Sequence, residues 1–324
     1  MKKTIQSLLT AVLATTVATV PTLVASAADY PERPVSLVVA YNPGGATDFQ
    51  ARIVTMLAGK ENYMNMPMVI FNRPGAGGKV GWTQFASKAK SDGYELAAYN
   101  VPHFIAQAIV FKTPYGIDNV EPVANWGADP AVLIVPKDSP FNSVKDVVAF
   151  AKKNPDKLTI NGAGLYVGHH IAYLQFAKES GTKLVYVPET GGAPALKNVI
   201  SGQVMAGFNN LSDAFRSQDR VKILGIADLE RHDFLPDVPT FKEQGVSVDN
   251  SSVNFRGIMA PKGTSEEILA YLSEKAVAMF GDGKVQGKMK AGGSPMHVMT
   301  RAEVQAMWKE RQAYLSDLLK DLVQ

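Results

Sequence analysis

The sequence alternates short β-branched runs with amphipathic helical stretches, and this alternation restricts the chain to an α/β fold. The first run spans residues 35–41 (VSLVVAY), and two more lie at 68–71 and 96–99. Between the first two, Phe49, Ile53, Met56 and Leu57 recur at the spacing of one helix face. Strands alternating with helices of this length predict mainly parallel sheets flanked by helices.

A second series of the same kind begins near residue 130, so two lobes around a cleft are expected. The 324-residue length fits two domains of roughly 150 residues each. We assign residues 28–126 and 256–324 to lobe 1 and residues 127–255 to lobe 2. The segments 122–129 and 254–259 are the candidate hinge strands, and the C-terminal helices are expected to return to lobe 1. Strands of the second series are predicted at 132–135, 158–161, 184–187, 204–208 and 222–227, and helices at 144–153, 169–179, 194–201, 211–217, 264–280 and 300–322.

The N-terminus has the pattern of a secretory signal peptide. Lys2 and Lys3 precede an apolar run from about Ile5 to Val24, and small residues follow at 25–27. The run is short and threonine-rich for a bilayer span. We therefore expect cleavage near Ala27 and export to the periplasm. Because the chain contains no cysteine, it also lacks the acceptor of a lipid anchor.

Four glycine-rich loops follow predicted strands and precede predicted helices. They lie at residues 43–48, 72–78, 161–164 and 188–193, two in each lobe. Helix N-termini expose unpaired N–H groups and attract anions, and glycine lets the backbone approach a ligand closely. Each loop alone is explained as well by a tight strand-to-helix turn. Together they favour one small anion, such as a carboxylate, held between the lobes at the carboxyl ends of the strands.

Other classes of function find little support. The absence of cysteine excludes disulfides, thiolate metal sites and cysteine nucleophiles. Lys and Arg total 33 against 30 acidic residues and are scattered, which argues against nucleic-acid binding. No motif of a phosphate-binding loop, a serine hydrolase or a zinc protease is present. The neighbours His169 and His170 point about 100° apart on a helix, so we expect one packed and one solvent-facing ring and no metal or cofactor.

The same loops resemble the Bug family, the periplasmic solute receptors of tripartite tricarboxylate transporters. The matching segments occur in the family's order along nearly the whole mature chain: residues 30–35 (YPERPV), 43–48 (PGGATD), 72–78 (NRPGAGG), 92–94 (DGY), 187–188 (VP), 191–195 (GGAPA), 202–204 (GQV) and 236–240 (PDVPT). The resemblance implies a two-lobed type II periplasmic-binding-protein fold that encloses a carboxylate. It also implies a two-subunit membrane permease as partner, and we expect the receptor to be a monomer.

The resemblance also implies where the ligand binds. The first two loops of the family grip the proximal carboxylate, and lobe 2 contacts the distal end of the ligand. Carried over to this chain and completed from neighbouring strand ends, the expected ligand-binding residues are Gly44, Gly45, Thr47, Asp48, Ala76, Gly77 and Asn100 in lobe 1, and Gly164, Tyr166, His169, Glu189, Thr190, Gly191 and Asn209 in lobe 2.

Lobe 2 departs from the family pattern. The usual serines ahead of the helix histidine are absent, Tyr166 replaces a glycine, and Glu189 with Thr190 replaces an aromatic and a cationic residue. Because Glu189 would repel a second carboxylate, we expect a monocarboxylate, or a carboxylate with an aromatic, hydroxyl or amino distal group. The alternative is that Glu189 is a solvent-exposed residue at the rim of the ligand site and does not face the ligand. Two other functions remain open: a receptor that feeds a sensor kinase, and a periplasmic hydrolase that uses Asp48 and a histidine.

Overall fold

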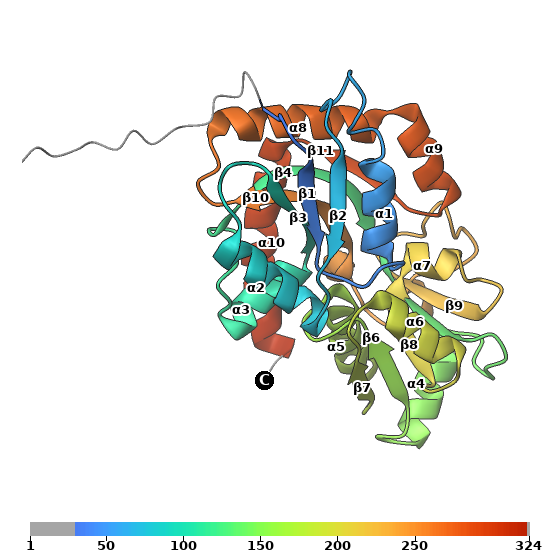
Figure 1. Cartoon of the computed structure of the whole chain (residues 1–324). Helices are drawn as coiled ribbons and strands as arrows, with labels where there is room; N and C mark the ends of the chain where they lie inside the picture. Colours follow the sequence, from blue (N-terminus) through green and yellow to red (C-terminus); the bar gives the residue numbers. More distant parts are fainter. Residues whose placement is uncertain (1–29, 323–324) are drawn as a thin grey trace, which may run out of the picture.

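The computed structural model describes residues 30–322, which form two lobes, each built on its own mixed sheet (Figure 1). The predicted signal peptide, residues 1–27, lies outside the described residues. Within residues 30–322, no helix is long and apolar enough to cross a membrane.

Lobe 1 is a six-stranded sheet in the order β11-β4-β10-β3-β1-β2. Its strands are β1 (Val35–Val39), β2 (Met68–Asn72), β3 (Glu95–Val101), β4 (Val120–Asp129), β10 (Asn254–Pro261) and β11 (Met296–Met299). Its helices are α1 (Ala46–Val54), α2 (Lys79–Lys88), α3 (His103–Phe111), α8 (Glu266–Gly281), α9 (Gly283–Ala291) and α10 (Arg301–Leu322), with the short 3-10 helix η2 (Ala76–Gly78) before α2.

Lobe 2 is a five-stranded sheet in the order β7-β6-β8-β5-β9. Its strands are β5 (Ala131–Pro136), β6 (Thr159–Gly162), β7 (Val185–Pro188), β8 (Ala206–Asn210) and β9 (Val221–Ala227). Its helices are α4 (Val144–Lys153), α5 (Gly168–Ser180), α6 (Gly192–Ile200) and α7 (Leu211–Phe215), followed by the 3-10 helices η3 (Lys242–Gln244) and η4 (Asn250–Ser252).

The expectation of mainly parallel sheets is wrong in detail. In lobe 1 only the pairs β1–β2 and β1–β3 are parallel, whereas β10 pairs antiparallel with both β3 and β4. In lobe 2, β5 pairs antiparallel with β8 and β9. The reason is topological: β4 carries the chain out of lobe 1 and β10 brings it back, so the two strands run in opposite directions.

The segments expected to form the hinge, 122–129 and 254–259, lie within β4 and β10, which are neighbours in the lobe 1 sheet. Asn254 stands opposite Asp129 at their shared end. Strand β5 of the second sheet starts at Ala131, immediately beyond that end. The chain therefore crosses between the lobes at two adjacent points.

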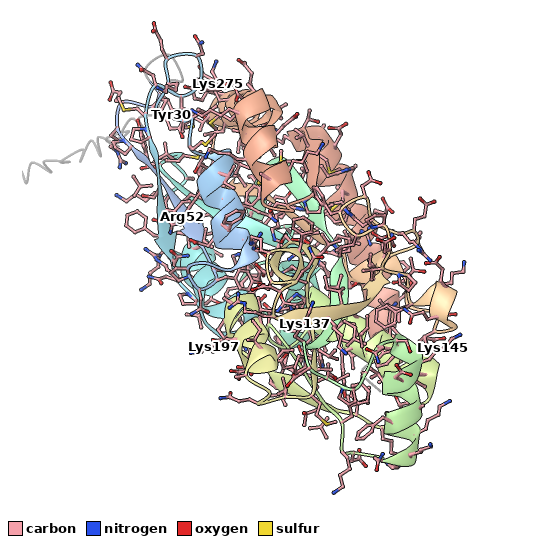
Figure 2. The ribbon with its side chains drawn as sticks, turned by 90° about the vertical axis from the view of Figure 1, so that its right-hand side faces the viewer. Tyr30, Arg52, Lys137, Lys145, Lys197 and Lys275 are labelled. Carbon is pink, nitrogen blue, oxygen red and sulfur yellow. The ribbon has the colours of Figure 1, made fainter. Side chains whose placement is uncertain are left out.

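The C-terminal helices return to lobe 1, as expected. Trp308 of α10 is buried and its ring packs edge-on against Tyr99 of β3 and Phe104 of α3, with centroid distances of 5.0 and 4.9 Å. One hydrophobic core joins residues from β1 to β4 with residues from β10 to α10. Lobe 2 has a separate core on each face of its sheet. Seen from the side, Tyr30 and Lys275 of lobe 1 lie near the top of the molecule, and Lys145 and Lys197 of lobe 2 lie in its lower half (Figure 2).

The sequence did not predict α3, α9 or β11. Helix α3 follows Pro102 directly and carries an apolar sequence that resembles a buried strand. Helix α9 is short and polar, and its start is capped by Asp282. Strand β11 has only four residues and pairs irregularly at the edge of the sheet.

Candidate functional site

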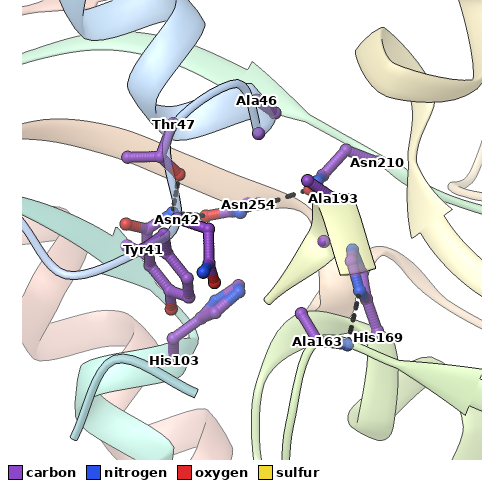
Figure 3. A pocket seen from close by; sticks show the side chains of 13 residues that line it. Tyr41, Asn42, Ala46, Thr47, His103, Ala163, His169, Ala193, Asn210 and Asn254 are labelled. Atoms are coloured by element: carbon purple, nitrogen blue, oxygen red, sulfur yellow. Dashed lines mark hydrogen bonds between the residues drawn. The ribbon is translucent and has the colours of Figure 1, made fainter. Parts of the chain in front are cut away.

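A small polar cavity lies where the loops of the two lobes meet (Figure 3). Its volume is about 20 Å³, room for about one water molecule. Lobe 1 contributes the turn after β1, the first residues of α1, the end of β3 and the start of α3. Lobe 2 contributes the turn after β6, the first turns of α5 and α6, and the end of β8. The site therefore lies at the carboxyl ends of the strands, as expected for sheets of this kind.

Buried side chains present unpaired polar atoms in this cavity. Asn42 Oδ1, Asn100 Oδ1, His103 Nδ1 and His169 Nε2 are buried and have no hydrogen-bond partner among residues 30–322. All four residues line the cavity. Since buried polar groups are nearly always hydrogen-bonded, four unpaired atoms at one place indicate a site built for a polar ligand.

The tautomer of His169 follows from its contacts. Its Nδ1 accepts a hydrogen bond of 3.1 Å from the Ala163 N–H, so the neutral ring carries its proton on Nε2. Desolvation lowers the pKa of His169 to about 4, and the same cause lowers the pKa of His103 well below its usual range. At neutral pH His169 is therefore an uncharged donor.

Two helix N-termini, one from each lobe, supply backbone donors. Helices α1 and α6 both start after a glycine, Gly45 and Gly191, and neither glycine provides a side-chain cap. The first residues of both helices line the cavity. An ideal Cβ on Gly45 would lie 3.8 Å from the Ala193 nitrogen, so the two N-termini are close together. Their N–H groups and helix dipoles make this point of the interface attractive to an anion.

A buried ion-pair network stands behind the cavity. Arg256 is fully buried and pairs with Asp129 at 2.6 Å. Its guanidinium also donates to Thr47 Oγ1 and Gln50 Oε1 in lobe 1 and to Asn210 Oδ1 in lobe 2. The protein thus supplies an acceptor for each of the three guanidinium nitrogens, and the network links the two lobes next to the crossing strands.

Of the residues expected to bind the ligand, Gly45, Thr47, Asn100 and His169 line the cavity. Gly45 is the N-cap of α1, so Thr47 does not cap this helix. Instead, Thr47 accepts hydrogen bonds from Asn100 and Arg256.

Asp48 and Gly44 lie beside the cavity and do not line it. The Asp48 carboxylate accepts hydrogen bonds from the Gly44 N–H, Arg52 and Asn72. Burial raises the pKa of Asp48, but these hydrogen bonds outweigh burial and the pKa is lowered overall. Asp48 also forms an ion pair of 2.8 Å with Arg52, four residues later in the chain.

Gly77 and Gly164 form a contact between the lobes, and Ala76 directly precedes Gly77 in η2. Gly77 and Gly164 both have positive φ, and an ideal Cβ on Gly164 would lie only 2.8 Å from Gly77 Cα. Gln107 of α3 bridges the same place by donating to the carbonyl oxygens of Gly77 and Leu165. The glycines let the two loops touch.

None of the remaining predicted residues of lobe 2 lines the cavity. The ring of Tyr166 packs against Phe111 of lobe 1 with a centroid distance of 5.2 Å. The Glu189 carboxylate accepts a hydrogen bond of 2.6 Å from Asn198. Asn209 donates to the Gly192 carbonyl. Thr190 is exposed, and Gly191 is the N-cap of α6, against Asn42 of lobe 1.

The prediction of one packed and one solvent-facing histidine is wrong. Both His169 and His170 are buried. His170 packs among Tyr166, Tyr173 and Tyr186, and its Nδ1 accepts from the Tyr166 N–H. Helix α5 is covered on both sides, so neither ring reaches solvent.

Several residues at the cavity were not among the expected ligand-binding residues. These are Tyr41, Asn42, His103, Asn210 and Asn254, together with Arg256 behind them. Asn42 and Asn210 adjoin predicted positions, so a wider window around the strand ends would have found them. His103 and Arg256 reach the site only through α3 and β10, whose places depend on the tertiary fold. No cluster of three or more metal-binding side chains occurs within residues 30–322.

The chain is similar to known solute receptors in sequence and structure. Residues 51–308 match the model of the tripartite tricarboxylate transporter family receptor, TctC. A protein of the tcbD–tcbE intergenic region of Pseudomonas sp. (strain P51) is 31% identical over 275 residues, 82% of this chain and 81% of the relative. Periplasmic binding protein BugD superposes with a TM-score of 0.84 at 28% identity, covering 90% of this chain and 98% of that one. The structure of MatC from Rhodopseudomonas palustris with bound malate superposes with a TM-score of 0.81 at 26% identity. The match covers 90% of this chain and 100% of MatC.

These matches agree with the geometry. The matched range contains the whole lobe 2 sheet, the lobe 1 sheet except β1, and eight of the thirteen residues that line the cavity. The two-lobed fold and the polar cavity between the lobes are those of a binding protein, and the matched family consists of receptors and not enzymes. The chain therefore belongs to the TctC family of tripartite tricarboxylate transporter receptors.

Proposed function

We propose that this chain is an exported receptor that binds a small organic carboxylate between its lobes and delivers it to a two-subunit permease. The signal peptide is removed near Ala27, and the mature chain acts in the periplasm as a monomer without a lipid anchor. The observation that carries the proposal is the meeting of donors from both lobes in one cavity. There the first turns of α1 and α6 and the Nε2–H of His169 converge.

The other unpaired atoms define the rest of the ligand. Asn42 and Asn100 each present a carbonyl oxygen, which accepts a hydrogen bond. A carboxylate satisfies the donors, and a hydroxyl or amino group satisfies the acceptors. We therefore propose a carboxylate with a polar substituent. MatC, which is solved with the hydroxy acid malate, is a relative whose ligand has this chemistry.

Ligand entry requires the lobes to separate. A cavity of about 20 Å³ is too small for an acid of several heavy atoms. The lobes, whose exact boundaries we place at residues 126/127 and 255/256, would rotate about the crossing points next to Asp129 and Asn254. On opening, the residues that now join the lobes, such as Gly77, Gly164 and Gly191, become accessible to the ligand.

The test is a thermal-unfolding panel on the mature chain. It contains mono-, di- and tricarboxylates, hydroxy acids, amino acids and aromatic acids. A ligand at about 100 times its Kd adds roughly 2.7 kcal/mol to the free energy of unfolding, which raises the Tm by several degrees. One class of carboxylate should give such a shift, and NMR should recover the acid unchanged. A flat response to the whole panel, or conversion of the acid, contradicts the proposal.

A further inference from the structure

Asp213 places a carboxylate of lobe 2 at the N-terminus of a lobe 1 helix. The residue lies on α7 and is almost fully buried. Its Oδ2 accepts a hydrogen bond of 3.3 Å from the Ala46 N–H, the first N–H of α1. The same oxygen accepts from Asn210 Nδ2 at 3.1 Å. A carboxylate of the protein thus occupies part of the donor set described above.

The position of Asp213 has an electrostatic reason. The N-termini of α1 and α6 meet across the interface, and each carries a partial positive charge. An ideal Cβ on Gly192, the first residue of α6, would lie 3.4 Å from Asp213 Oδ2. The carboxylate therefore lies close to both helix ends. Without an anion at this point, the two helix dipoles would repel each other when the lobes close.

Two neighbours of Asp213 also reach lobe 1. Arg216 pairs with Asp213, donates to the Gly292 carbonyl at 3.0 Å and lies over the Phe49 ring at 4.3 Å. The ring of Phe215 packs against Gly293 so closely that a Cβ there would clash. One end of α7 is therefore fitted to lobe 1.

We propose that Asp213 is an internal closing contact: its carboxylate takes the place at the α1 N-terminus that a ligand's carboxylate would otherwise fill, and so draws the lobes together. This inference rests on the proposed function in one respect, which is that the α1 N-terminus is part of the ligand site. A contact that favours the closed form reduces the fraction of receptor that can admit ligand, and it weakens the apparent affinity by that fraction. Asp213 thereby sets how tightly the receptor binds.

The test measures the separation of the lobes directly. Lys60, just after α1, and Lys197 on α6 are exposed. Because the chain contains no cysteine, the pair Lys60→Cys and Lys197→Cys can be spin-labelled selectively. The labelled mature chain is unfolded and refolded to remove bound small molecules, and the label distance is measured by pulsed electron resonance. Three versions are compared: the parent, Asp213→Asn, and the control Asp219→Asn, which removes one negative charge from an exposed position on the same lobe.

A second variant removes the donor in place of the acceptor. Ala46 is the first residue of α1, where proline is well accepted, and Gly45 before it has the extended backbone (ψ 168°) that proline requires. Ala46→Pro removes the N–H group that donates a hydrogen bond to Asp213 and leaves the Asp213 side chain unchanged. If D213N fails to fold, A46P still decides the question.

The expected result is a longer label distance, or a second and longer population, in D213N and in A46P, with D219N equal to the parent. The double variant should open no further than either single variant, because both remove the same contact. Folded D213N and A46P with the parent's distance distribution overturn the inference. The measurement uses no ligand, so a negative carboxylate panel counts against the proposed function and an unchanged distance counts against the closing contact.

Discussion

Single residues at the interface differ in whether their polar atoms are paired. Thr47 and Arg256 lie in a closed network in which every group has a partner, whereas His169 and Asn100 each keep one atom free toward the cavity. Paired groups hold the backbone of the site, and free groups are left for the ligand. This division gives different expectations for mutations only a few ångströms apart.

Thr47→Val should destabilise the fold. The Thr47 hydroxyl accepts hydrogen bonds from Arg256 Nε at 3.2 Å and from Asn100 Nδ2 at 3.0 Å. Valine has no hydroxyl, so both buried donors lose this acceptor. An unsatisfied buried donor costs about 1–3 kcal/mol. The control is Thr55→Val. The Thr55 hydroxyl donates only to the Ala51 carbonyl of α1, so removing this hydroxyl should cost less than about 1 kcal/mol. Urea unfolding measures both, and equal losses contradict the network.

The buried histidines should make the protein less stable in mild acid. Burial lowers the pKa of His170 to about 4, so between pH 6.5 and 4 the unfolded chain binds a proton that the folded chain does not. Stability then decreases as the pH falls, by about 2 kcal/mol from this residue between pH 7 and 5. His170→Gln should reduce the loss by that amount in urea titrations at the two pH values. An unchanged pH dependence would show that His170 titrates normally in the folded protein.

Sequence reasoning identified some of these residues and missed others for a physical reason. Asn100 lies near the end of a strand and Thr47 lies at the start of a helix, and both places can be recognised from the neighbouring residues in the sequence. His103 and Asp213 lie on helices with no loop motif and reach the interface only when the lobes meet. Glu189 shows the converse: its charge is visible in the sequence, but its hydrogen bond to Asn198 is not.

At the scale of elements, the glycine-rich loops serve two purposes. Those before α1 and α6 place a glycine at the N-cap, so no N-cap side chain covers the helix N-termini that line the cavity. The loops at residues 75–78 and 162–165 touch each other across the interface. The sequence predicted all of these loops, but it did not distinguish loops that face the cavity from loops that join the lobes, because that depends on the angle between two sheets.

Gly164→Ala should keep the lobes apart. Its Cβ would lie 2.8 Å from Gly77 Cα, a backbone atom that cannot move aside while the lobes are closed. Gly181→Ala is the matched control, since Gly181 also has positive φ but its Cβ would meet nothing within 4 Å. The radius of gyration from small-angle scattering should rise in G164A and remain unchanged in G181A. A compact G164A would show that the Gly77–Gly164 contact is not required for closure.

At the scale of the whole molecule, the chain leaves lobe 1 once and returns once. The alternation of strands and helices was enough to predict two α/β lobes and the return of the C-terminal helices. It did not predict that β4, β5 and β10 would make both sheets mixed, because alternation shows the order of elements and not their direction. The two crossings lie side by side, so the proposed rotation of one lobe against the other would leave one core in lobe 1 and two in lobe 2.

The most direct test of the account is a calorimetric titration of the mature chain with the acid that stabilises it most. Two variants accompany it: Ala193→Phe, which fills the cavity from α6, and Ala302→Phe, which adds the same ring to an exposed position on α10. The account predicts one acid per chain for the parent and A302F, and loss of binding in A193F. Binding of the acid by A193F with the parent's Kd would place the ligand elsewhere and contradict a site between the lobes.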